Sequence, residues 1–314
     1  MTELRIAAVS VDLDEVHEYV KIHDLRPIAG AGSHAVYDVA LRRIEAWSTR
    51  WALPITFFAV GRDLDRAENA SALRRLSAMG HAVESHSLSH RYDLTRLSPA
   101  EIETEVRQGL DAVERAVGIR PEGFRAPGYT VCDPLFDALD RAGVRFDSSV
   151  LPSPVYYAAK AAVLGWMHLR GRGSASILDT PRVVLSPRGP YVPGEFWGRP
   201  ARGGPRRRFV ELPILVTPLL RFPVIGTSVG RVGGRMLARA CRREPFVNFE
   251  LHGMDFLEAA DLGAHPLRAA QPELRAPLGI RLERLGVFVS ELLAGGFTFV
   301  TLREAARRIQ ALPV

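Results

Sequence analysis

Cysteine is scarce in this chain of 314 residues, and long apolar runs are missing. The two cysteines, Cys132 and Cys241, are too few for a disulfide framework and indicate a reducing compartment. No stretch reaches the ~20 consecutive apolar residues that span a bilayer. The first residues lead into an apolar strand without the charged leader and apolar core of a secretory signal. We therefore expect a cytoplasmic protein, or one attached peripherally to the inner face of the membrane.

Lysine is nearly absent too, since only Lys21 and Lys160 occur and 39 of the 41 basic residues are arginine. An arginine bias is typical of a GC-rich genome, and it also suits phosphate or an anionic membrane surface. The net charge is +6, and the contents of hydrophobic (47%) and charged (24%) residues are ordinary for a globular protein. We predict no nucleic-acid partner.

Strand-like and helix-like segments alternate from the N-terminus to about residue 150. This rhythm predicts parallel βα units, and the chain length suits a barrel of ~250 residues with an insertion. The clearest local signal is Ser98-Pro99-Ala100-Glu101, a capping box with proline at the first helical position. The predicted strands span 6–11, 54–60, 80–84, 123–127 and 144–149, and the predicted helices span 36–51, 69–79 (with Asn69 as N-cap and Gly80 as C-cap), 98–117 and 133–142.

The alternation breaks at Leu151. Nine of the 22 prolines lie between Pro181 and Pro223, which favours extended loops there. We treat 1–314 as a single domain in which 151–230 is an insertion or lid. Strand and helix signals return at 209–215 (strand), 235–241 (helix), 246–251 (strand), 278–293 (helix), 297–301 (strand) and 302–312 (helix).

Two features of the insertion each allow two interpretations. Val155, Ala159, Val163 and Met167 recur every four residues beside Trp166, forming one apolar helical face. We favour a face packed on the domain over a membrane-surface element. The arginine-rich stretch 199–208 is interpreted as a solvated loop, with contact to phosphate or lipid headgroups as the alternative.

Polar residues follow several predicted strands, at the edge where parallel α/β folds place their chemistry. A histidine pair spaced four residues apart can present both imidazoles to one metal ion, although alone such a pair is more often two surface or core histidines. One carboxylate and two imidazoles would leave coordination positions open, as a catalytic metal site requires. The strand-end residues are Asp12, Asp14, His86, His90, Arg125, Asp147 and His252.

The two aspartates lie two apart, so in an extended strand they project to the same side. The alternative is a pair of loop carboxylates that cap the next segment. With a metal in place, a second carboxylate can accept a proton from the bound water and a histidine can protonate the leaving group. An arginine near the carboxylate would hold it ionised.

Five segments in order resemble the polysaccharide deacetylases of carbohydrate esterase family four, also called the NodB homology domain. They are Ser10-Val11-Asp12-Leu13-Asp14, His86-Ser87-Leu88-Ser89-His90, Arg125-Ala126-Pro127-Gly128-Tyr129, Asp147-Ser148-Ser149 and Leu251-His252. The resemblance implies an α/β fold, a distorted (β/α)7-type barrel, and metal-dependent N-deacetylation of an acetamido sugar. The first segment is similar to a subgroup with an Asp-x-Asp motif.

The resemblance also implies roles for individual residues. Asp14, His86 and His90 would bind Zn²⁺ or another divalent ion such as Co²⁺, Ni²⁺ or Mn²⁺. Asp12 would be the general base, with Arg125 orienting it, although the roles of Asp12 and Asp14 can be exchanged. His252 would be the general acid, supported by Asp147. The oxyanion donor would be the backbone N–H of Gly128 or Tyr129, because glycine stands where the family usually has an aromatic residue.

The sequence thus predicts a hydrolase of a linear amide bond in an amino-sugar substrate. A lipid-linked, glycolipid or nucleotide-linked precursor is favoured, because no secretory signal is visible. One alternative is a related metal-dependent hydrolase of a non-sugar amide or formamide. Another is an inactive barrel that binds a glycan or lipid.

Overall fold

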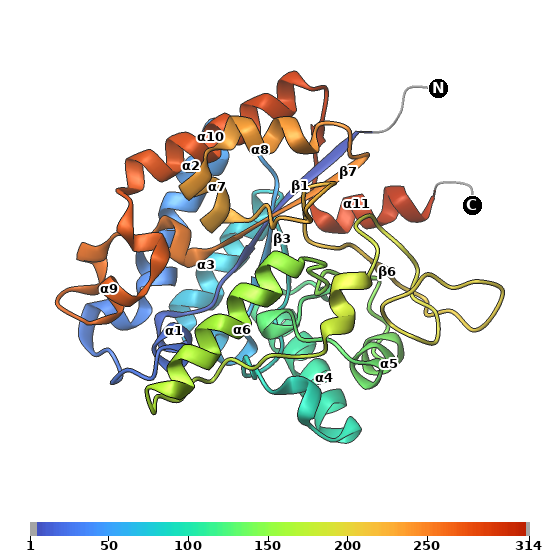
Figure 1. Cartoon of the computed structure of the whole chain (residues 1–314), viewed down its shortest axis with the longest axis horizontal. Helices are drawn as coiled ribbons and strands as arrows, with labels where there is room; N and C mark the ends of the chain where they lie inside the picture. The colour runs from blue at the N-terminus through green and yellow to red at the C-terminus, as the bar shows by residue number, and fades with distance from the viewer. Residues whose placement is uncertain (1–4, 312–314) are drawn as a thin grey trace.

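Parallel β-strands form the centre of the molecule in the computed structural model, which describes residues 5–311 (Figure 1). Within these residues the sheet has eight strands, and seven follow the order β6-β5-β4-β3-β2-β1-β7, while β8 pairs with β1. The strands are β1 (Ile6–Asp12), β2 (Ile55–Ala59), β3 (Ala82–Ser85), β4 (Gly123–Phe124), β5 (Phe146–Asp147), β6 (Val210–Glu211), β7 (Phe246–His252) and β8 (Thr298–Phe299).

The two ends of this order meet, so the sheet curls into a barrel. Beyond β6, the Leu215 amide donates to the Asn248 carbonyl of β7 (3.0 Å). The Asn248 side-chain amide donates back to the Leu212 carbonyl (2.9 Å). The contact replaces a regular ladder, which makes the barrel distorted. The predicted fold class is therefore confirmed, and the region 151–230 contains one strand of the barrel.

Helices surround the sheet and link consecutive strands (Figure 1). The Ser98 capping box forms as predicted, with the Ser98 hydroxyl accepting from the Glu101 amide. The helices are α1 (Val16–Ile22), α2 (Leu41–Trp51), α3 (Ala67–Ala78), α4 (Pro99–Val117), α5 (Asp133–Arg141), α6 (Pro154–Leu169), α7 (Gly226–Val232), α8 (Gly234–Cys241), α9 (Leu267–Ala270), α10 (Leu278–Ala294) and α11 (Leu302–Gln310).

Some predicted boundaries shift. The prediction of Asn69 as an N-cap is wrong: α3 begins at Ala67, and the Asn69 side chain donates to the Asp63 carbonyl inside the first turn. The helix predicted over 36–51 begins with a π-helical turn, Val36–Ala40, before α2. Helix α7 was not predicted, because glycine and valine carry little helical signal. Leu312, the predicted end of the last helix, lies outside the described residues.

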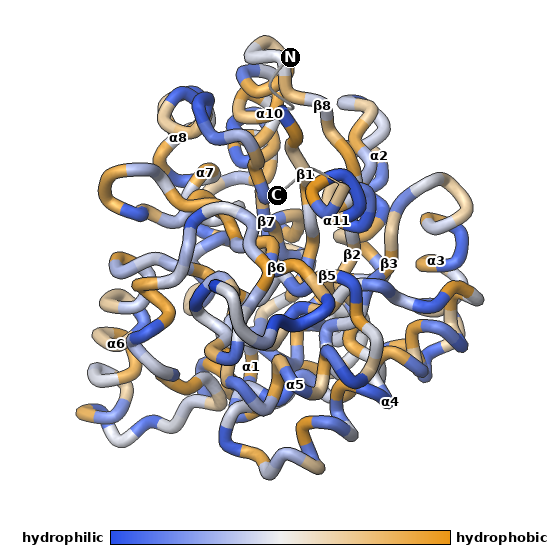
Figure 2. The backbone as a smooth tube through the Cα atoms, turned by 90° about the vertical axis from the view of Figure 1, so that its right-hand side faces the viewer, coloured by the Kyte–Doolittle hydropathy of each residue, from blue (hydrophilic) through white to orange (hydrophobic). Residues whose placement is uncertain are grey.

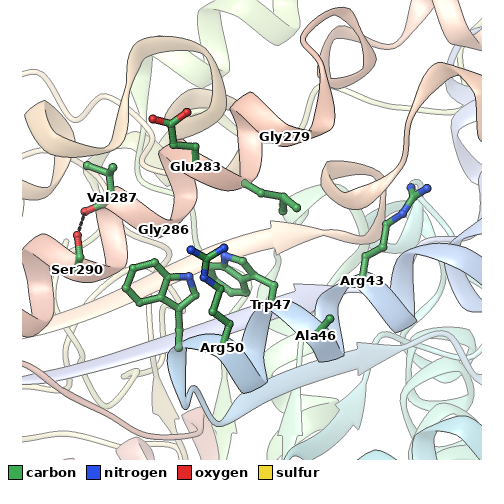
Figure 3. Close-up of a pocket in the computed structure, with 11 residues that line it drawn as sticks. Arg43, Ala46, Trp47, Arg50, Gly279, Glu283, Gly286, Val287 and Ser290 are labelled. Atoms are coloured by element: carbon green, nitrogen blue, oxygen red, sulfur yellow. Dashed lines mark hydrogen bonds between the residues drawn. The ribbon is translucent and has the colours of Figure 1, made fainter.

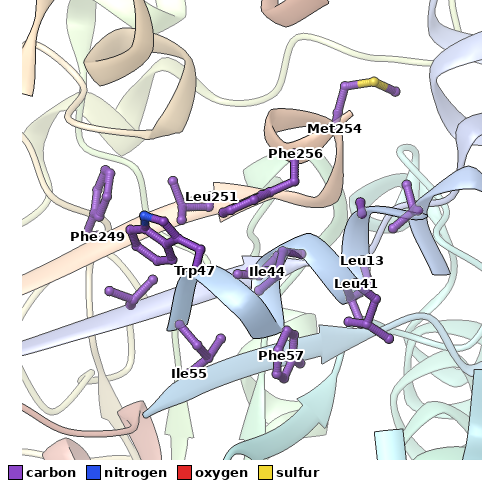
Figure 4. Packing of buried hydrophobic residues seen from close by; sticks show 14 of the residues in the cluster. Leu13, Leu41, Ile44, Trp47, Ile55, Phe57, Phe249, Leu251, Met254 and Phe256 are labelled. Atoms are coloured by element: carbon purple, nitrogen blue, oxygen red, sulfur yellow. The ribbon is translucent and has the colours of Figure 1, made fainter. Parts of the chain in front are cut away.

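The main core lies between the β1, β2 and β7 strands and the helices that cover them (Figure 4). On α2, Ile44 is fully buried and Trp47 packs edge-to-face on Phe256 with ring centroids 5.8 Å apart. Phe249 of β7 packs on Phe288 of α10. These contacts hold the long strands β1 and β7 rigidly, and both strands end at polar residues.

Helix α6 departs from its favoured interpretation. Of its sixteen residues, all of which the structure describes, only Met167 is buried. Val155, Val163 and Trp166 are 40%, 55% and 49% exposed. The apolar face predicted to pack on the domain is therefore mostly in solvent.

Two further surface features are plain. Across residues 5–311, no helix is both long and apolar enough to cross a bilayer. A groove of about 540 Å³ lies between α2 and α10, lined by Trp47, Trp51 and Arg50 on one side and Gly286 on the other (Figure 3). None of the residues that line this groove is among the predicted site residues.

Candidate metal centre and its flanking carboxylates

Strand β1 brings its two acidic residues to the carboxyl edge of the sheet. Asp12 is the last residue of β1 and lies in register with Phe58 of β2 and His252 of β7. Asp14 follows one residue beyond Leu13, whose side chain is fully buried in the core. The alternation of the extended chain therefore buries Leu13 and leaves Asp12 and Asp14 at the site.

The loop after β3 turns sharply between its two histidines. Ser87 and His90 both have a positive φ (64° and 52°), and the His90 amide donates to the Ser87 hydroxyl (3.1 Å). The imidazole rings of His86 and His90 consequently lie 4.8 Å apart. Gly109 of α4 allows this turn, because a Cβ there would lie 2.7 Å from the backbone carbon of Ser87.

These two loops converge on Asp14. Its Oδ1 lies 3.1 Å from His86 Nε2 and 3.1 Å from His90 Nε2. All three residues are buried, and their ligand atoms lie within 4.8 Å of one another. Asp12 stands further away, with Oδ2 3.9 Å from His86 Nε2. The predicted ligand set thus comes together, with Asp14 at its centre and Asp12 beside it.

A hydrogen bond behind His86 and a carboxylate contact behind His90 aim the Nε2 atoms of both rings at Asp14. His86 Nδ1 lies 2.8 Å from the Arg125 carbonyl, which can only accept, so Nδ1 carries the proton and Nε2 keeps its lone pair. His90 Nδ1 faces Glu18 Oε2 of α1 at 3.3 Å. Burial alone would raise the pKa of Glu18, but His17, His90 and Lys21 outweigh it and lower the pKa to about 2. Carboxylates and carbonyls in this position orient metal-binding histidines.

The donor set fits a divalent cation. Asp14 Oδ1 and His90 Nε2 are buried, and neither has a hydrogen-bond partner within residues 5–311. Orphaned buried polar atoms are costly, and a cation would satisfy these at once. Two imidazoles and one carboxylate suit Zn²⁺ or a similar first-row ion and leave room for further ligands.

Asp12 is held by a buried arginine. Arg125 Nη1 donates to Asp12 Oδ1 (2.7 Å), while its Nε and Nη2 donate to the Ser148 carbonyl and hydroxyl. The guanidinium also lies 4.2 Å over the Phe58 ring. Burial raises the pKa of Asp12, and the lowering effects of Arg125 and His86 do not offset it. Arg125 therefore orients Asp12, but it does not by itself hold the carboxyl at an ordinary pKa.

His252 lies beside Asp14, with its Nε2 3.8 Å from Asp14 Oδ2. Asp12, Glu250 and His252 also form a cluster whose potential ligand atoms lie within 4.8 Å of one another. Glu250, not Asp147, is its partner: Glu250 Oε1 lies 2.9 Å from His252 Nδ1. The interpretation of Asp147 as the support of His252 is corrected here. Burial alone would lower the pKa of His252, but Glu250, Asp14 and Asp12 raise it well above the usual value.

Asp147 instead supports the arginine loop. The Ser149 hydroxyl donates to Asp147 Oδ1 (2.7 Å) and accepts from the Ala126 amide (2.8 Å). Asp147 also lies in register with Glu211 of β6, and burial raises the pKa of both carboxyls. The Asp147-Ser148-Ser149 segment thus holds the backbone of the loop that carries Arg125.

Gly128 and Tyr129 lie in a tight turn beside His252. Both have a positive φ (61° and 59°), and the rings of Tyr129 and His252 are 6.5 Å apart. The Tyr129 amide donates to the Ala126 carbonyl (3.2 Å), so that N–H is already engaged. Of the two backbone donors considered from sequence, the engagement of Tyr129 favours Gly128.

Two carboxylates of the site were missed from sequence. Glu250 is two residues before His252 on β7, so both side chains project to the same side of the sheet, and a charged residue in an apolar strand is the signal that would have identified it. Glu18 lies four residues after Asp14, where the first turn of α1 carries it back towards His90. Nothing in the spacing of Glu18 distinguishes it from a solvated helix residue.

Part of the chain is similar in sequence to known polysaccharide deacetylases. The sequence model of the family described as "Polysaccharide deacetylase" matches residues 43–146. A chitin deacetylase of Colletotrichum lindemuthianum is 37% identical over 81 residues, which is 25% of this chain and 32% of that protein. A chitooligosaccharide deacetylase of Bradyrhizobium sp. (strain ANU 289) is 36% identical over 80 residues, which is 25% of this chain and 35% of that protein. The chain thus spans about a third of the length of these relatives.

The fold is shared over nearly the whole chain. A crystal structure from Mycobacterium smegmatis, described as that of a polysaccharide deacetylase, superposes with a TM-score of 0.58 at 15% identity. The superposition covers 99% of this chain and 92% of that one. At this identity the likeness concerns the fold, and it confirms the barrel predicted from sequence.

Proposed function

We propose that this chain, whose residues 43–146 match the sequence model of polysaccharide deacetylases, is a metal-dependent N-deacetylase that hydrolyses the acetamide of an amino sugar. The observation that carries the proposal is the arrangement around Asp14. Two histidine nitrogens lie 3.1 Å from one of its oxygens. The Asp12 carboxylate lies 3.9 Å from His86, and the His252 imidazole lies 3.8 Å from Asp14.

In this proposal Asp14, His86 and His90 hold Zn²⁺, or another divalent ion such as Co²⁺, Ni²⁺ or Mn²⁺. Such an ion supplies Lewis-acid polarisation of the amide carbonyl and a bound water whose pKa is near 7. The Arg125 carbonyl and Glu18 keep the two imidazoles in the tautomers that this requires.

Asp12 takes the proton of the attacking water. Its Oδ1 is anchored by Arg125, and its buried Oδ2 has no hydrogen-bond partner within the described residues, so this oxygen is available. The raised pKa of Asp12 brings it closer to that of a useful base at neutral pH. The water oxygen bonds to the carbonyl carbon of the acetamide.

His252 completes the reaction as the general acid. Held protonated by Glu250, its Nε2 gives a proton to the amide nitrogen as the C–N bond breaks. The products are acetate and a free amino sugar, so one water is consumed and the atoms balance. Tyr129 and Tyr156, whose rings are 5.6 Å apart, line the adjoining surface where a sugar ring would lie.

The finer substrate class is an amino sugar on a precursor, either lipid-linked, as a glycolipid, or nucleotide-linked. The relatives are named for chitin and chitooligosaccharide, which supports an N-acetylated sugar. A buried base, its orienting arginine and a carboxylate-supported histidine have no use in a barrel that only binds a glycan or lipid, so this arrangement favours catalysis.

The test has two parts. Purified protein is assayed for acetate released from N-acetylhexosamine glycosides and for formate released from small formamides, and its metal content is measured. Asp14→Asn and His86→Ala should lose both bound metal and activity, while the exposed His34→Ala should keep them. Glu18→Gln should weaken metal affinity about 10–100-fold without abolishing it.

Full acetate release by metal-free His86→Ala protein would refute the mechanism. Formate release without acetate release would show that the chain is a formamide hydrolase instead. Metal binding without release of either acid would support a binding barrel.

A further inference from the structure

Helix α6 presents an apolar surface to solvent. Its outer face consists of Val155, Ala159, Ala162, Val163, Trp166 and Leu169, and all six residues are exposed. Leu169 alone is 86% exposed. A helix on the surface of a globular protein normally carries charged or polar residues on its outer side. The outer face of α6 has none, so this surface is built for contact with something other than water.

Other surface helices of the same chain follow the ordinary pattern. On α4 the exposed Arg107 forms an ion pair at 2.6 Å with the half-buried Glu103. On α11 the pair Glu304–Arg308 does the same at 2.7 Å. The apolar exterior of α6 is therefore a local property of this helix and does not reflect a generally apolar surface.

Basic residues outnumber acidic ones in the segment that carries α6. Between Asp147 and Asp179 the sequence has no acidic residue. Residues 148–210 contain ten of the chain's 41 basic residues and two of its 35 acidic residues. The rest of the chain has 31 basic and 33 acidic residues. Some of the arginines within 148–210 form ion pairs with carboxylates outside the segment, as Arg188 does with Glu244, Arg207 with Asp137 and Arg208 with Asp140. The basic residues nearest α6 include Arg170 at its C-terminal end and Arg182 on the 3₁₀ helix that contacts it. At the C-terminal end of the helix, the Arg170 guanidinium lies 4.6 Å over the Trp166 ring.

Apolar exposure continues in two neighbouring segments. Leu185 ends a short 3₁₀ helix that contacts α6, and it is 77% exposed. The turn at 217–222 presents Leu219 and Leu220, which are 94% and 75% exposed. Arg221 ties this turn to the 3₁₀ helix by donating to the Ser186 carbonyl (3.0 Å). Isolated exposed leucines are common, but these three lie in two hydrogen-bonded segments, one of which contacts α6, and they add to the exposed apolar surface of this region.

We propose that the outer face of α6 binds an anionic phospholipid surface, with basic residues beside the helix, such as Arg170 and Arg182, contacting the headgroups. Apolar side chains on one helix face, a tryptophan stacked with arginine and a surplus of basic residues are the features of helices that lie in a membrane interface. Each basic residue near an anionic surface adds favourable electrostatic energy. Figure 2 shows α6 at one edge of the molecule, where its outer side can meet a flat surface.

A second copy of the chain fits this surface less well. In a symmetric dimer the same patch of both subunits meets, so the basic residues around α6 would face those of the partner. Such like-charge contact is unfavourable, whereas an anionic bilayer complements it.

The inner side of α6 lies against the proposed catalytic centre. Lys160 donates to the Gly128 carbonyl (3.1 Å), and Tyr156 packs on Tyr129. A helix is ~10 Å across, so a bilayer on the outer face would lie about that distance from Gly128. This orientation suits an amino sugar attached to a lipid, a point that rests on the proposed function. The lipid contact itself does not depend on it.

The experiment is co-sedimentation of the full chain with vesicles of phosphatidylcholine alone or with phosphatidylglycerol. We expect binding to the anionic vesicles that falls in high salt, and little binding to the neutral ones. The variant Val163→Glu/Trp166→Glu should bind at least about tenfold more weakly. Ile119→Glu is the matched control, because Ile119 is exposed to the same extent as Trp166 (both 49%) but lies in the loop after α4.

Tryptophan fluorescence tests the contact directly. Emission should shift to shorter wavelength on anionic vesicles and be quenched by brominated acyl chains, and both effects should disappear in Trp166→Phe. Equal binding of the double-glutamate variant, or equal binding to both vesicle types, would overturn the proposal. So would a concentration-dependent dimer that the double variant abolishes while vesicles have no effect.

Vesicle binding by the His86→Ala variant separates the two proposals. That variant should bind vesicles as the unaltered chain does, because the outer face of α6 is intact. Loss of deacetylase activity with retained vesicle binding therefore tests the metal centre, and loss of vesicle binding with retained activity on soluble substrates tests the surface.

Discussion

The strand-end edge of the barrel and the outer face of α6 break the usual distribution of residues in opposite directions. At the edge, charged groups such as Asp12, Glu18 and Arg125 are buried. On α6, large apolar groups such as Trp166 and Leu169 are exposed. Burying a charge costs free energy unless a partner is present, and exposing an apolar surface costs free energy unless something covers it. Both regions are therefore expected to have binding partners, an ion and substrate in one and a surface in the other.

Removal of the buried arginine at the strand-end edge should have the greatest consequence. Arg125→Ala would leave Asp12 buried without its cationic partner, and we expect a loss of about 3–5 kcal/mol of unfolding free energy together with loss of activity. Urea unfolding measures the first quantity. Arg145→Ala, at an exposed position on the adjacent strand connection, is the control. A loss below about 1 kcal/mol for Arg125→Ala would show that the edge tolerates an unpaired charge.

Two glycines, one in α4 and one in α6, test how tightly each region is packed. A Cβ at Gly109 of α4 would lie 2.7 Å from the backbone of Ser87, so Gly109→Ala should displace the histidine loop, cost about 1–3 kcal/mol and weaken metal binding. A Cβ at Gly165 of α6 meets nothing within 4 Å, so Gly165→Ala should raise stability by up to about 1 kcal/mol. Thermal unfolding and metal titration distinguish the two. Equal effects would mean that α4 does not hold the loop.

The pH dependence of the reaction tests the role of Glu250 as the partner of His252. Glu250 raises the pKa of His252, and the proposed acid acts only when protonated. In Glu250→Gln the pKa of His252 should fall, so the alkaline limb of kcat/KM should move to lower pH by about one unit or more. The same change also removes stability. The raised pKa of His252 stabilises the folded state fully below the ordinary histidine pKa, and this contribution is lost as the pH rises through the raised value. An unmoved alkaline limb would contradict the assignment of His252 as the acid.

The smallest effect is expected on the exposed side. Val163 is 55% exposed, so Val163→Glu should change unfolding free energy by no more than about 0.5 kcal/mol. Thermal unfolding in the absence of lipid checks this. A loss of 2 kcal/mol or more would show that α6 packs on the protein, as the favoured interpretation of its sequence had it.

Much of the barrel could be read from the order of residues. The apolar run of β1 and the Ser98 capping box are local signals, and both elements formed where predicted. Boundaries were less certain, because the short strands β4 and β5 depend on pairing with neighbours that are distant in sequence. The interpretation of α6 was wrong in its favoured form, since periodicity identifies a helix face but not what lies against it.

The residue types at the ends of the strands could be predicted without coordinates, because strand alternation and parallel βα order are local properties of the chain. Only the tertiary structure decided which of them meet. It paired His252 with Glu250 and moved Asp147 to the arginine loop. The rest of the site depends on the register between strands and on the path of loops, which bring Asp12 to Arg125 and Asp14 to His252, more than a hundred residues apart in each case.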